Sequence, residues 1–191
     1  MAHRRLHRLA ALCALALVAA GALSACGKQS NKPGETVREG LSTPLGGLRY
    51  TVFLTRQLNL RNEEDKGYLP GVQEAPPKKG WYAVFLEACN KGKREAVASS
   101  SFFITDTQGG RFEPTDLPEE NPFAYHGGVV PPENCDPARG SLAQQGPTSG
   151  SVLLFQLPLA ATENRPLELH IEGPFNPAEG KRSEATVVLD I

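Results

Sequence analysis

The period of the hydrophobic pattern is the feature that most constrains this sequence. Residues 48–55 (LRYTVFLT) alternate between apolar and polar positions, and residues 167–171 and 185–191 do the same. A period of two places successive side chains on opposite faces of a strand, whereas an amphipathic helix needs a period of 3.6. The alternation therefore predicts a fold built from strands.

Four further segments favour strands. Residues 81–89 form the most apolar run in this part of the chain and predict a central strand. Residues 102–104 and 111–112 flank a glycine-containing hairpin turn, and residues 151–157 form another apolar run. About seven short strands with frequent turn residues and little helical pattern predict an all-β fold, an antiparallel immunoglobulin-like β-sandwich. Residues 157–164 could hold one helical turn.

The first 26 residues predict an export signal. Three arginines among the first eight residues precede an apolar run over residues 9–23 that is too short to span a bilayer stably. The run ends in Leu23-Ser24-Ala25-Cys26, which resembles the lipobox of bacterial prolipoproteins.

In that family the cysteine receives a diacylglycerol thioether, the signal is cut before it, and the new amine is acylated. The resemblance implies that residues 1–25 are a cleaved signal peptide and that Cys26 is the lipidation site. Two or three acyl chains would then hold the protein on the extracytoplasmic side of the cell membrane. The alternatives are a plain signal peptide with an accidental cysteine, an uncleaved membrane helix, and twin-arginine export, whose flanking pattern fits less well.

The cysteines separate by position. On this interpretation Cys13 leaves with the signal and Cys26 carries lipid, so that Cys89 and Cys135 remain. An even pair in an oxidising compartment predicts one disulfide. Two free thiols are the alternative.

Composition limits the class of partner. Without residues 1–25 the chain has 166 residues, enough for one domain with a core, and it keeps 17 basic against 21 acidic residues. This balance predicts no nucleic-acid binding, which usually needs a basic surface. We expect a lipidated cysteine and flexible tether over residues 26–47, within which residues 36–41 could add an edge strand. The sandwich domain then covers residues 48–191.

Three segments resemble a known group of domains. Gly80-Trp81-Tyr82-Ala83-Val84-Phe85-Leu86 running to Asn90, the hairpin over residues 103–112 and the strand Gly150–Pro158 are similar to immunoglobulin-like domains of unknown function on bacterial lipoproteins. The immunoprotective extracellular protein family of mycobacteria shares that sandwich. The resemblance implies a fold and brings no catalytic residues. The chain departs from antibody domains because Trp81 precedes both Cys89 and Cys135.

The histidines give little support for catalysis. Tyr125-His126-Gly127-Gly128 resembles the oxyanion segment of some esterases, but the chain has no Gly-x-Ser-x-Gly elbow, and Thr148-Ser149-Gly150-Ser151 is the nearest segment. We predict no catalytic residues and expect His170 to be a solvated histidine on the polar face of a strand.

Metal ligands are also scarce. The single methionine is Met1, which argues against copper, because copper carriers use thioether or clustered imidazole ligands. The acidic groups at residues 63–65 and 119–120 lack the alternating spacing of a calcium loop, so we predict solvated loop charge. No metal and no cofactor are predicted.

The long Pro-rich segment over residues 113–147 is the first candidate for a binding surface. Phe123, Tyr125 and His126 lie in it, followed by Val129 and Val130, and the predicted disulfide would restrain it. The same aromatics could instead pack under the loop as a second, smaller core.

We predict a membrane-anchored, non-catalytic binding or structural module of the cell envelope, with a protein or another envelope component as its partner. The alternatives are a solute- or ion-binding lipoprotein with a site in the 113–147 loop, and an uncharacterised hydrolase.

Overall fold

The computed structural model describes residues 34–177 and 180–191; the predicted signal peptide and Cys26 lie outside them. The described chain contains thirteen strands and three short helical segments. In chain order these are β1 (Val37–Arg38), β2 (Ser42–Leu45), β3 (Leu48–Leu58), α2 (Glu63–Tyr68), β4 (Lys79–Cys89), β5 (Ala96–Ala98), β6 (Ser101–Thr105), β7 (Arg111–Phe112), β8 (Pro114–Thr115), β9 (Gly128–Val130), β10 (Cys135–Asp136), α3 (Leu142–Gln145), β11 (Ser151–Pro158), η2 (Leu159–Glu163), β12 (Leu167–Asn176) and β13 (Lys181–Leu189).

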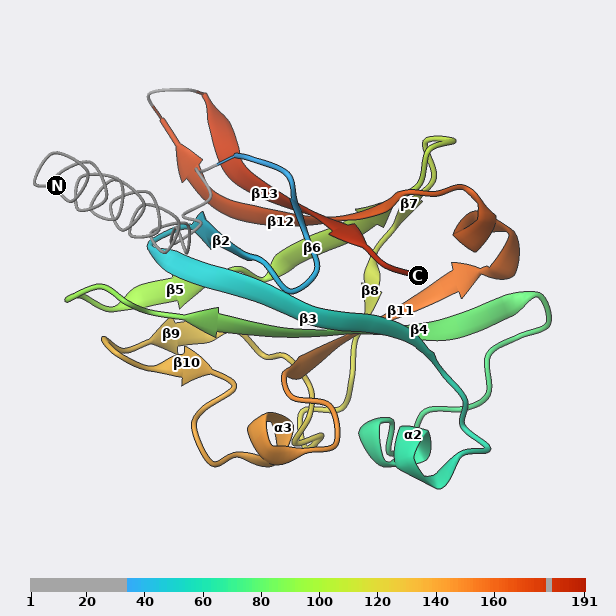
Figure 1. Cartoon of the computed structure of the whole chain (residues 1–191). Helices are drawn as coiled ribbons and strands as arrows, with labels where there is room; N and C mark the ends of the chain where they lie inside the picture. The colour runs from blue at the N-terminus through green and yellow to red at the C-terminus, as the bar shows by residue number, and fades with distance from the viewer. Residues whose placement is uncertain (1–33, 178–179) are drawn as a thin grey trace, which may run out of the picture. The chain divides into compact units, whose positions relative to one another are not determined.

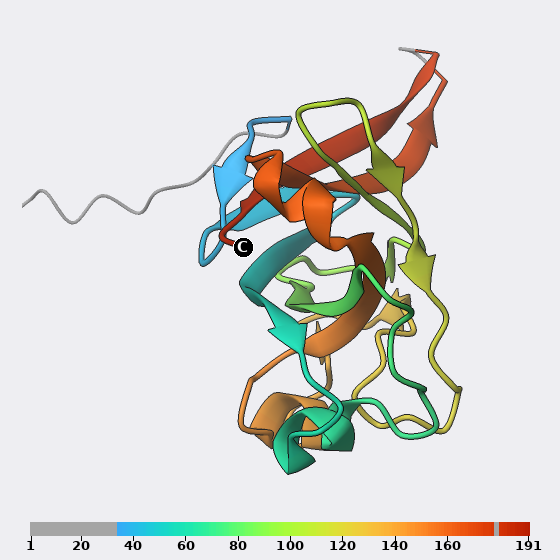
Figure 2. The same cartoon turned by 90° about the vertical axis from the view of Figure 1, so that its right-hand side faces the viewer.

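Two sheets form the body of the molecule (Figure 1). One has the order β1-β13-β12-β6-β7, and the other has the order β2-β3-β4-β11-β8 with β10 beside β4. Figure 2 shows the sheets as two layers, with α2 and α3 below the second sheet. Named strands pair antiparallel except β1, which runs parallel to β13. The predicted all-β sandwich is therefore confirmed.

The predicted strands lie where the hydrophobic period placed them. Each of the seven predicted segments falls on a strand of the two sheets, the hairpin at residues 101–112 joins β6 to β7, and η2 is the predicted helical turn. The central position of residues 81–89 is also confirmed, because β4 lies between β3 and β11.

The central strand β4 is buried on both faces. Tyr82, Val84 and Leu86 point into the main core between the sheets. Trp81 and Phe85 point to the other side, into a second core. The second core is closed by residues from α2 and from the long segment after β8, which include Tyr68, Leu69, Leu117 and Phe123. A strand covered on both faces needs an unbroken apolar run, which explains the composition of β4.

The second half of the predicted tether belongs to the sandwich. β1 pairs with β13 and β2 pairs with β3, and these contacts bury Val37 and Leu45. β1 is the edge strand that residues 36–41 could add. The prediction of a flexible tether was wrong for β2, because pairing with β3, not local propensity, forms this strand. Gly46 and Gly47 connect β2 to β3 with φ values of 61° and 85°, which a two-residue hairpin turn favours.

Candidate functional site

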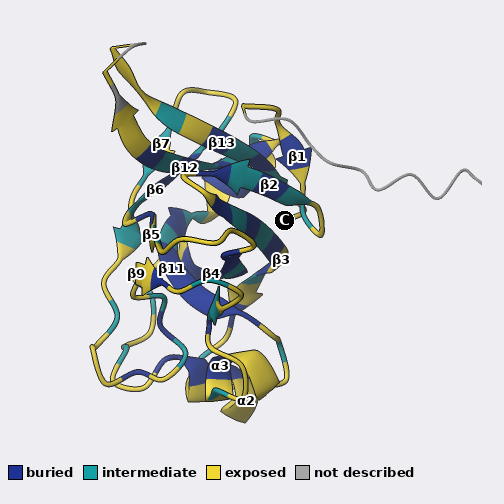
Figure 3. Ribbon diagram, turned by 90° about the vertical axis from the view of Figure 1, so that its left-hand side faces the viewer, coloured by how far each residue is buried: buried dark blue, intermediate teal, exposed yellow. Residues whose placement is uncertain are grey.

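Loops from both sheets meet at one end of the sandwich, which faces the viewer in Figure 3. We name this the loop end; it consists of the β2–β3 turn, the β4–β5 loop, the small β5–β9 sheet and the described residues of the β12–β13 hairpin. Its parts are in contact: a Cβ placed on Gly46 would lie 3.2 Å from Pro174, and one on Gly47 would lie 3.6 Å from Ala96. Loops on a rigid scaffold are common binding surfaces.

A disulfide joins β4 to β10 next to the loop end. Cys89 at the end of β4 is bonded to Cys135 of β10, and the two residues are also register partners. The bond ties the 113–147 segment to the central strand, as predicted. The carboxylate of Glu87 lies within 4.8 Å of both sulfur atoms, but bonded sulfurs are not thiolate ligands, so this group does not make a metal site.

The buried side chain of Asn90 fixes the loop that follows. Its Nδ2 donates to the carbonyls of Arg94 (2.7 Å) and Val130 (2.8 Å), and its Oδ1 accepts from the N–H of Gly92 (2.8 Å). One amide therefore links the β4–β5 loop to β9. A satisfied buried amide of this kind makes the loop rigid.

Two tyrosines support β5 from inside. The hydroxyl of Tyr50 accepts from the N–H of Ser99 (2.7 Å), and the hydroxyl of Tyr125 donates to the carbonyl of Ser99 (2.9 Å). Burial raises the pKa of both tyrosines, so both hydroxyls remain protonated. Both side chains are fixed structural groups.

Asp136 of β10 is a half-buried carboxylate with few polar partners. Its Oδ2 is buried without a hydrogen-bond partner among the described residues, and its Oδ1 is 3.5 Å from the hydroxyl of Ser151. Burial raises the pKa of Asp136, and the nearby His126 partly opposes that shift. A weakly satisfied carboxylate therefore lies near the exposed His126.

Apolar side chains stand out from this rigid base. Val97 and Val129 are direct register partners in the β5–β9 sheet, yet they are 67% and 60% exposed. Phe175 on the β12–β13 hairpin is 57% exposed. A cavity of about 360 Å³ opens beside Val97 and is lined by residues of the β2–β3 turn, of β5 and of the β12–β13 hairpin, including Arg182. The loop end thus combines exposed apolar groups with a small hollow.

The predicted surface residues are not brought together. Phe123 packs into the second core, with its ring centroid 4.9 Å from that of Tyr68. Tyr125 packs against the main core, 5.2 Å from the ring of Phe102. His126 alone of the three is exposed. The two aromatics therefore take the alternative role that the sequence left open.

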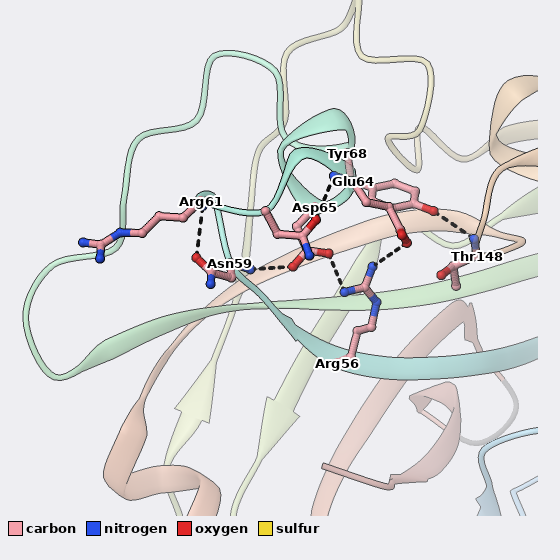
Figure 4. A network of polar contacts seen from close by, with 8 residues as sticks. Arg56, Asn59, Arg61, Glu64, Asp65, Tyr68 and Thr148 are labelled. Atoms are coloured by element: carbon pink, nitrogen blue, oxygen red, sulfur yellow. Dashed lines mark hydrogen bonds and ion pairs between the residues drawn. The ribbon is translucent and has the colours of Figure 1, made fainter.

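The prediction of solvated charge at residues 63–65 was wrong for Asp65. Figure 4 shows its carboxylate accepting from Arg56 Nη1 (2.5 Å) and from the N–H of Asn59 (2.8 Å). Asp65 is 5% exposed, whereas Glu64 is exposed and lies 3.5 Å from the same arginine. The acidic run holds α2 against β3, which is a structural role.

His170 is also more structural than predicted. Its ring stacks on Phe103 at 4.5 Å with an interplanar angle of 4°, Nε2 lies 2.8 Å from the hydroxyl of Thr105, and Nδ1 lies 2.5 Å from Glu184. Its side chain is 15% exposed, so it is not a solvated histidine. The row of hydroxyl, imidazole and carboxylate crosses three strands of the first sheet.

No helix among the described residues is long and apolar enough to cross a membrane. No protein-family model matches the sequence, and no curated protein matches it either.

Solved structures are similar to the fold. The yjhA protein from Bacillus subtilis is 14% identical with a TM-score of 0.51, covering 81% of this chain and 99% of its own. The ycdA protein from Bacillus subtilis, a candidate lipoprotein, has a TM-score of 0.47 at 10% identity, covering 77% and 38%. An uncharacterised β-sandwich protein from Clostridium difficile 630 has a TM-score of 0.46 at 15% identity, covering 86% and 99%. The likeness to yjhA concerns the fold alone.

Proposed function

We propose that this chain is a lipid-anchored, extracytoplasmic module of the cell envelope that binds a protein or another envelope component without catalysis. The loop end is its binding surface. The observation that carries the proposal is the pair of exposed valines, Val97 and Val129, above the Cys89–Cys135 disulfide. We further infer that the sandwich is immunoglobulin-like and related to the mycobacterial immunoprotective extracellular proteins; the sequence motifs noted above support this.

The lipid anchor is supported by the lipobox-like segment ending in Cys26. A disulfide within the fold fits the oxidising compartment that such an anchor implies. Mass spectrometry of the protein from its native membrane tests this: we expect a mature chain that begins at Cys26 and carries acyl groups. An unmodified thiol at Cys26 with residues 1–25 still attached would refute the anchor.

The binding surface is tested by amine labelling on intact cells. Lys91 and Lys93 lie on the β4–β5 loop, whereas Lys66 and Lys78 lie outside the loop end, and all four are exposed. We expect the first pair to be protected in the anchored protein. The comparison is a soluble form, residues 27–191 exported with a cleavable signal that is not lipidated, in which both pairs should react. Equal labelling of both pairs on cells would show that the loop end is free.

Solute binding is the alternative that a specific observation favours. The 360 Å³ cavity beside Val97 is within the size range of small-ligand sites, and Arg182 and Glu172 lie on its wall. A solute carried by the protein would appear in native mass spectrometry of the soluble form as a bound mass that is lost on denaturation.

The hydrolase alternative depends on Thr105, because its hydroxyl, His170 and Glu184 follow the order that activates nucleophiles. We propose that the row stabilises the sheet instead. Thr105→Ala should then leave any slow turnover of activated esters unchanged.

A further inference from the structure

We propose that the loop end docks on the anionic surface of the membrane that holds the anchor, so that the sandwich stands with this end toward the lipid headgroups. The inference rests on the lipid anchor at Cys26 proposed above and names the partner of the same surface.

The chain joins the fold at the loop end. Gly34 lines a surface hollow of about 580 Å³ together with Gly46 and Gly47 of the β2–β3 turn and Lys181 and Arg182 of the β12–β13 hairpin. Gly34 is eight residues after Cys26. Even a fully extended chain of eight residues spans at most about 28 Å. A lipid on Cys26 would therefore hold Gly34, and the loop end around it, within about 28 Å of the headgroups.

The loop end carries unpaired positive charge. Five exposed cations lie on its loops, and none forms an ion pair with a carboxylate of the described residues. These loop-end cations are Lys91, Lys93, Arg94, Lys181 and Arg182. Elsewhere, four arginines are paired with acids: Arg38, Arg56, Arg61 and Arg111. Glu95 and Glu133 share the loops. Glu172 and Glu184 line the same hollows as Arg182 but are bound to Ser101 and His170, and Glu87 lies near Lys91. The excess of positive charge therefore concerns the exposed groups that are not bound within the fold.

Exposed apolar side chains lie among the cations. Val97 lines the same cavity as Arg182, and Phe175 is the register partner of Arg182 on the hairpin. Apolar side chains flanked by lysine and arginine suit the membrane interface, where the apolar part enters the headgroup boundary and the charge stays at the anionic surface. Each basic residue near such a surface strengthens binding about fivefold, within a range of roughly 10 Å.

The geometry favours the membrane over a protein partner. A partner protein would have to fit into a space limited by the eight-residue connection, whereas the headgroups already lie within reach of the loops. The connection also makes docking an intramolecular step, so that weak contacts suffice. The excess of acids over bases in the chain after residue 25 would disfavour other orientations on an anionic surface.

The first test measures binding of the soluble form, residues 27–191, to vesicles of phosphatidylcholine with one quarter phosphatidylglycerol. We expect binding at low salt that is lost at about 0.5 M salt, and little binding to phosphatidylcholine alone.

The loop-end variant carries Lys91→Gln, Arg94→Gln, Lys181→Gln and Arg182→Gln, and should bind at least tenfold more weakly. The control variant has the same charge change outside the loop end, with Lys66→Gln, Lys78→Gln, Lys79→Gln and Arg139→Gln, and should bind within about twofold of the unchanged protein. Equal losses in the two variants, or no binding of the unchanged protein, would overturn the proposal.

The second test separates lipid from protein as the partner. The acylated protein is reconstituted in the same vesicles without other proteins, and amine labelling of Lys91 and Lys181 is compared with that of Lys66. Protection of the loop-end lysines in these vesicles supports membrane docking. Protection on intact cells but not in vesicles would assign the surface to a protein and overturn docking, while leaving the binding module intact. Absence of acyl groups on Cys26 would refute the anchor instead, and the vesicle assay of the soluble form is independent of that result.

Discussion

Two aspartates of this protein differ in their surroundings, the buried Asp65 and the half-buried Asp136. Asp65 accepts a charged hydrogen bond from Arg56 and a second one from the backbone of Asn59. Asp136 has one oxygen without a partner among the described residues and a long contact to Ser151. A buried carboxylate is stable when it is paired and costly when it is not. Asp65 should therefore stabilise the fold, and Asp136 should weaken it.

We expect Asp65→Ala to lower the free energy of unfolding by about 3 kcal/mol, because it leaves Arg56 without its buried partner. Glu64→Ala removes only the exposed contact to the same arginine and should cost at most about 1 kcal/mol. Urea unfolding of the two variants measures both values. Similar losses would mean that the burial of Asp65 is not what matters.

The effect of Asp136→Asn should depend on pH. Burial raises the pKa of Asp136 in the folded state, so the folded protein resists ionisation and loses stability as the pH rises through that pKa. Asn carries no charge, so the variant should melt at a higher temperature than the unchanged protein at pH 7. The difference should vanish below the unfolded pKa of about 3.9.

Asp106 provides a control of opposite sign. A hydrogen bond from Asn164 lowers the pKa of Asp106, so its stabilisation is present above the unfolded pKa and is lost as the pH falls through the folded pKa. Asp106→Asn should therefore lower the melting temperature at pH 7 and have no effect at low pH. Thermal melts of both variants between pH 3 and pH 7 check the two signs.

At the scale of elements, the hydrophobic period predicted the strands that pack by their own side chains. β4 is apolar throughout because both of its faces are covered, and β12 and β13 alternate because one face is. The period did not predict β2, which is short and formed by pairing with β3, whereas β1 lies within residues 36–41, where an edge strand was allowed for. Gly46-Gly47, two glycines between extended residues, was the available signal for the β2–β3 hairpin.

The arrangement of the loop end was harder to predict than the fold. The disulfide pair followed from cysteine positions, whereas the roles of Phe123 and Tyr125 depend on which core each loop covers. Val97 lies between two alanines in a three-residue strand, and no local pattern marks it as exposed. In the sequence Asn90 resembles an ordinary turn residue, because its hydrogen bond to Val130 of β9 depends on the fold. Long-range pairing decides each of these positions.

The disulfide should matter most for the elements it joins. Cys89→Ser with Cys135→Ser should lower the free energy of unfolding by up to about 4 kcal/mol, because the open chain gains the entropy of a loop of more than forty residues. Limited proteolysis should then cut between β9 and α3, where the bond held the segment against β4. A reductant should reproduce this in the unchanged protein and have no effect on the double variant.

At the scale of the whole molecule, the boundary of the folded domain lies before residue 48. A chain that begins at Leu48 loses the pairing of β1 and β2 and exposes surface that Val37 and Leu45 cover. Each of these side chains contributes about 1.5–3 kcal/mol when buried. We therefore expect residues 48–191 to unfold at a clearly lower urea concentration than residues 34–191. Equal urea midpoints for the two chains would show that the folded domain begins at residue 48, as predicted from the sequence.

The pairing of β1 with β13 also has a mechanical consequence. Tension applied through the proposed lipid anchor on Cys26 would enter the sandwich at Gly34 and act first on the two-residue β1, then on the four-residue β2, and only later on the eleven-residue β3. Release of residues 34–47 would lengthen the connection by about 50 Å, while the loop closed by Cys89 and Cys135 stays shut. Under tension, β1 and β2 would therefore detach first, and the rest of the sandwich would stay folded until a higher force.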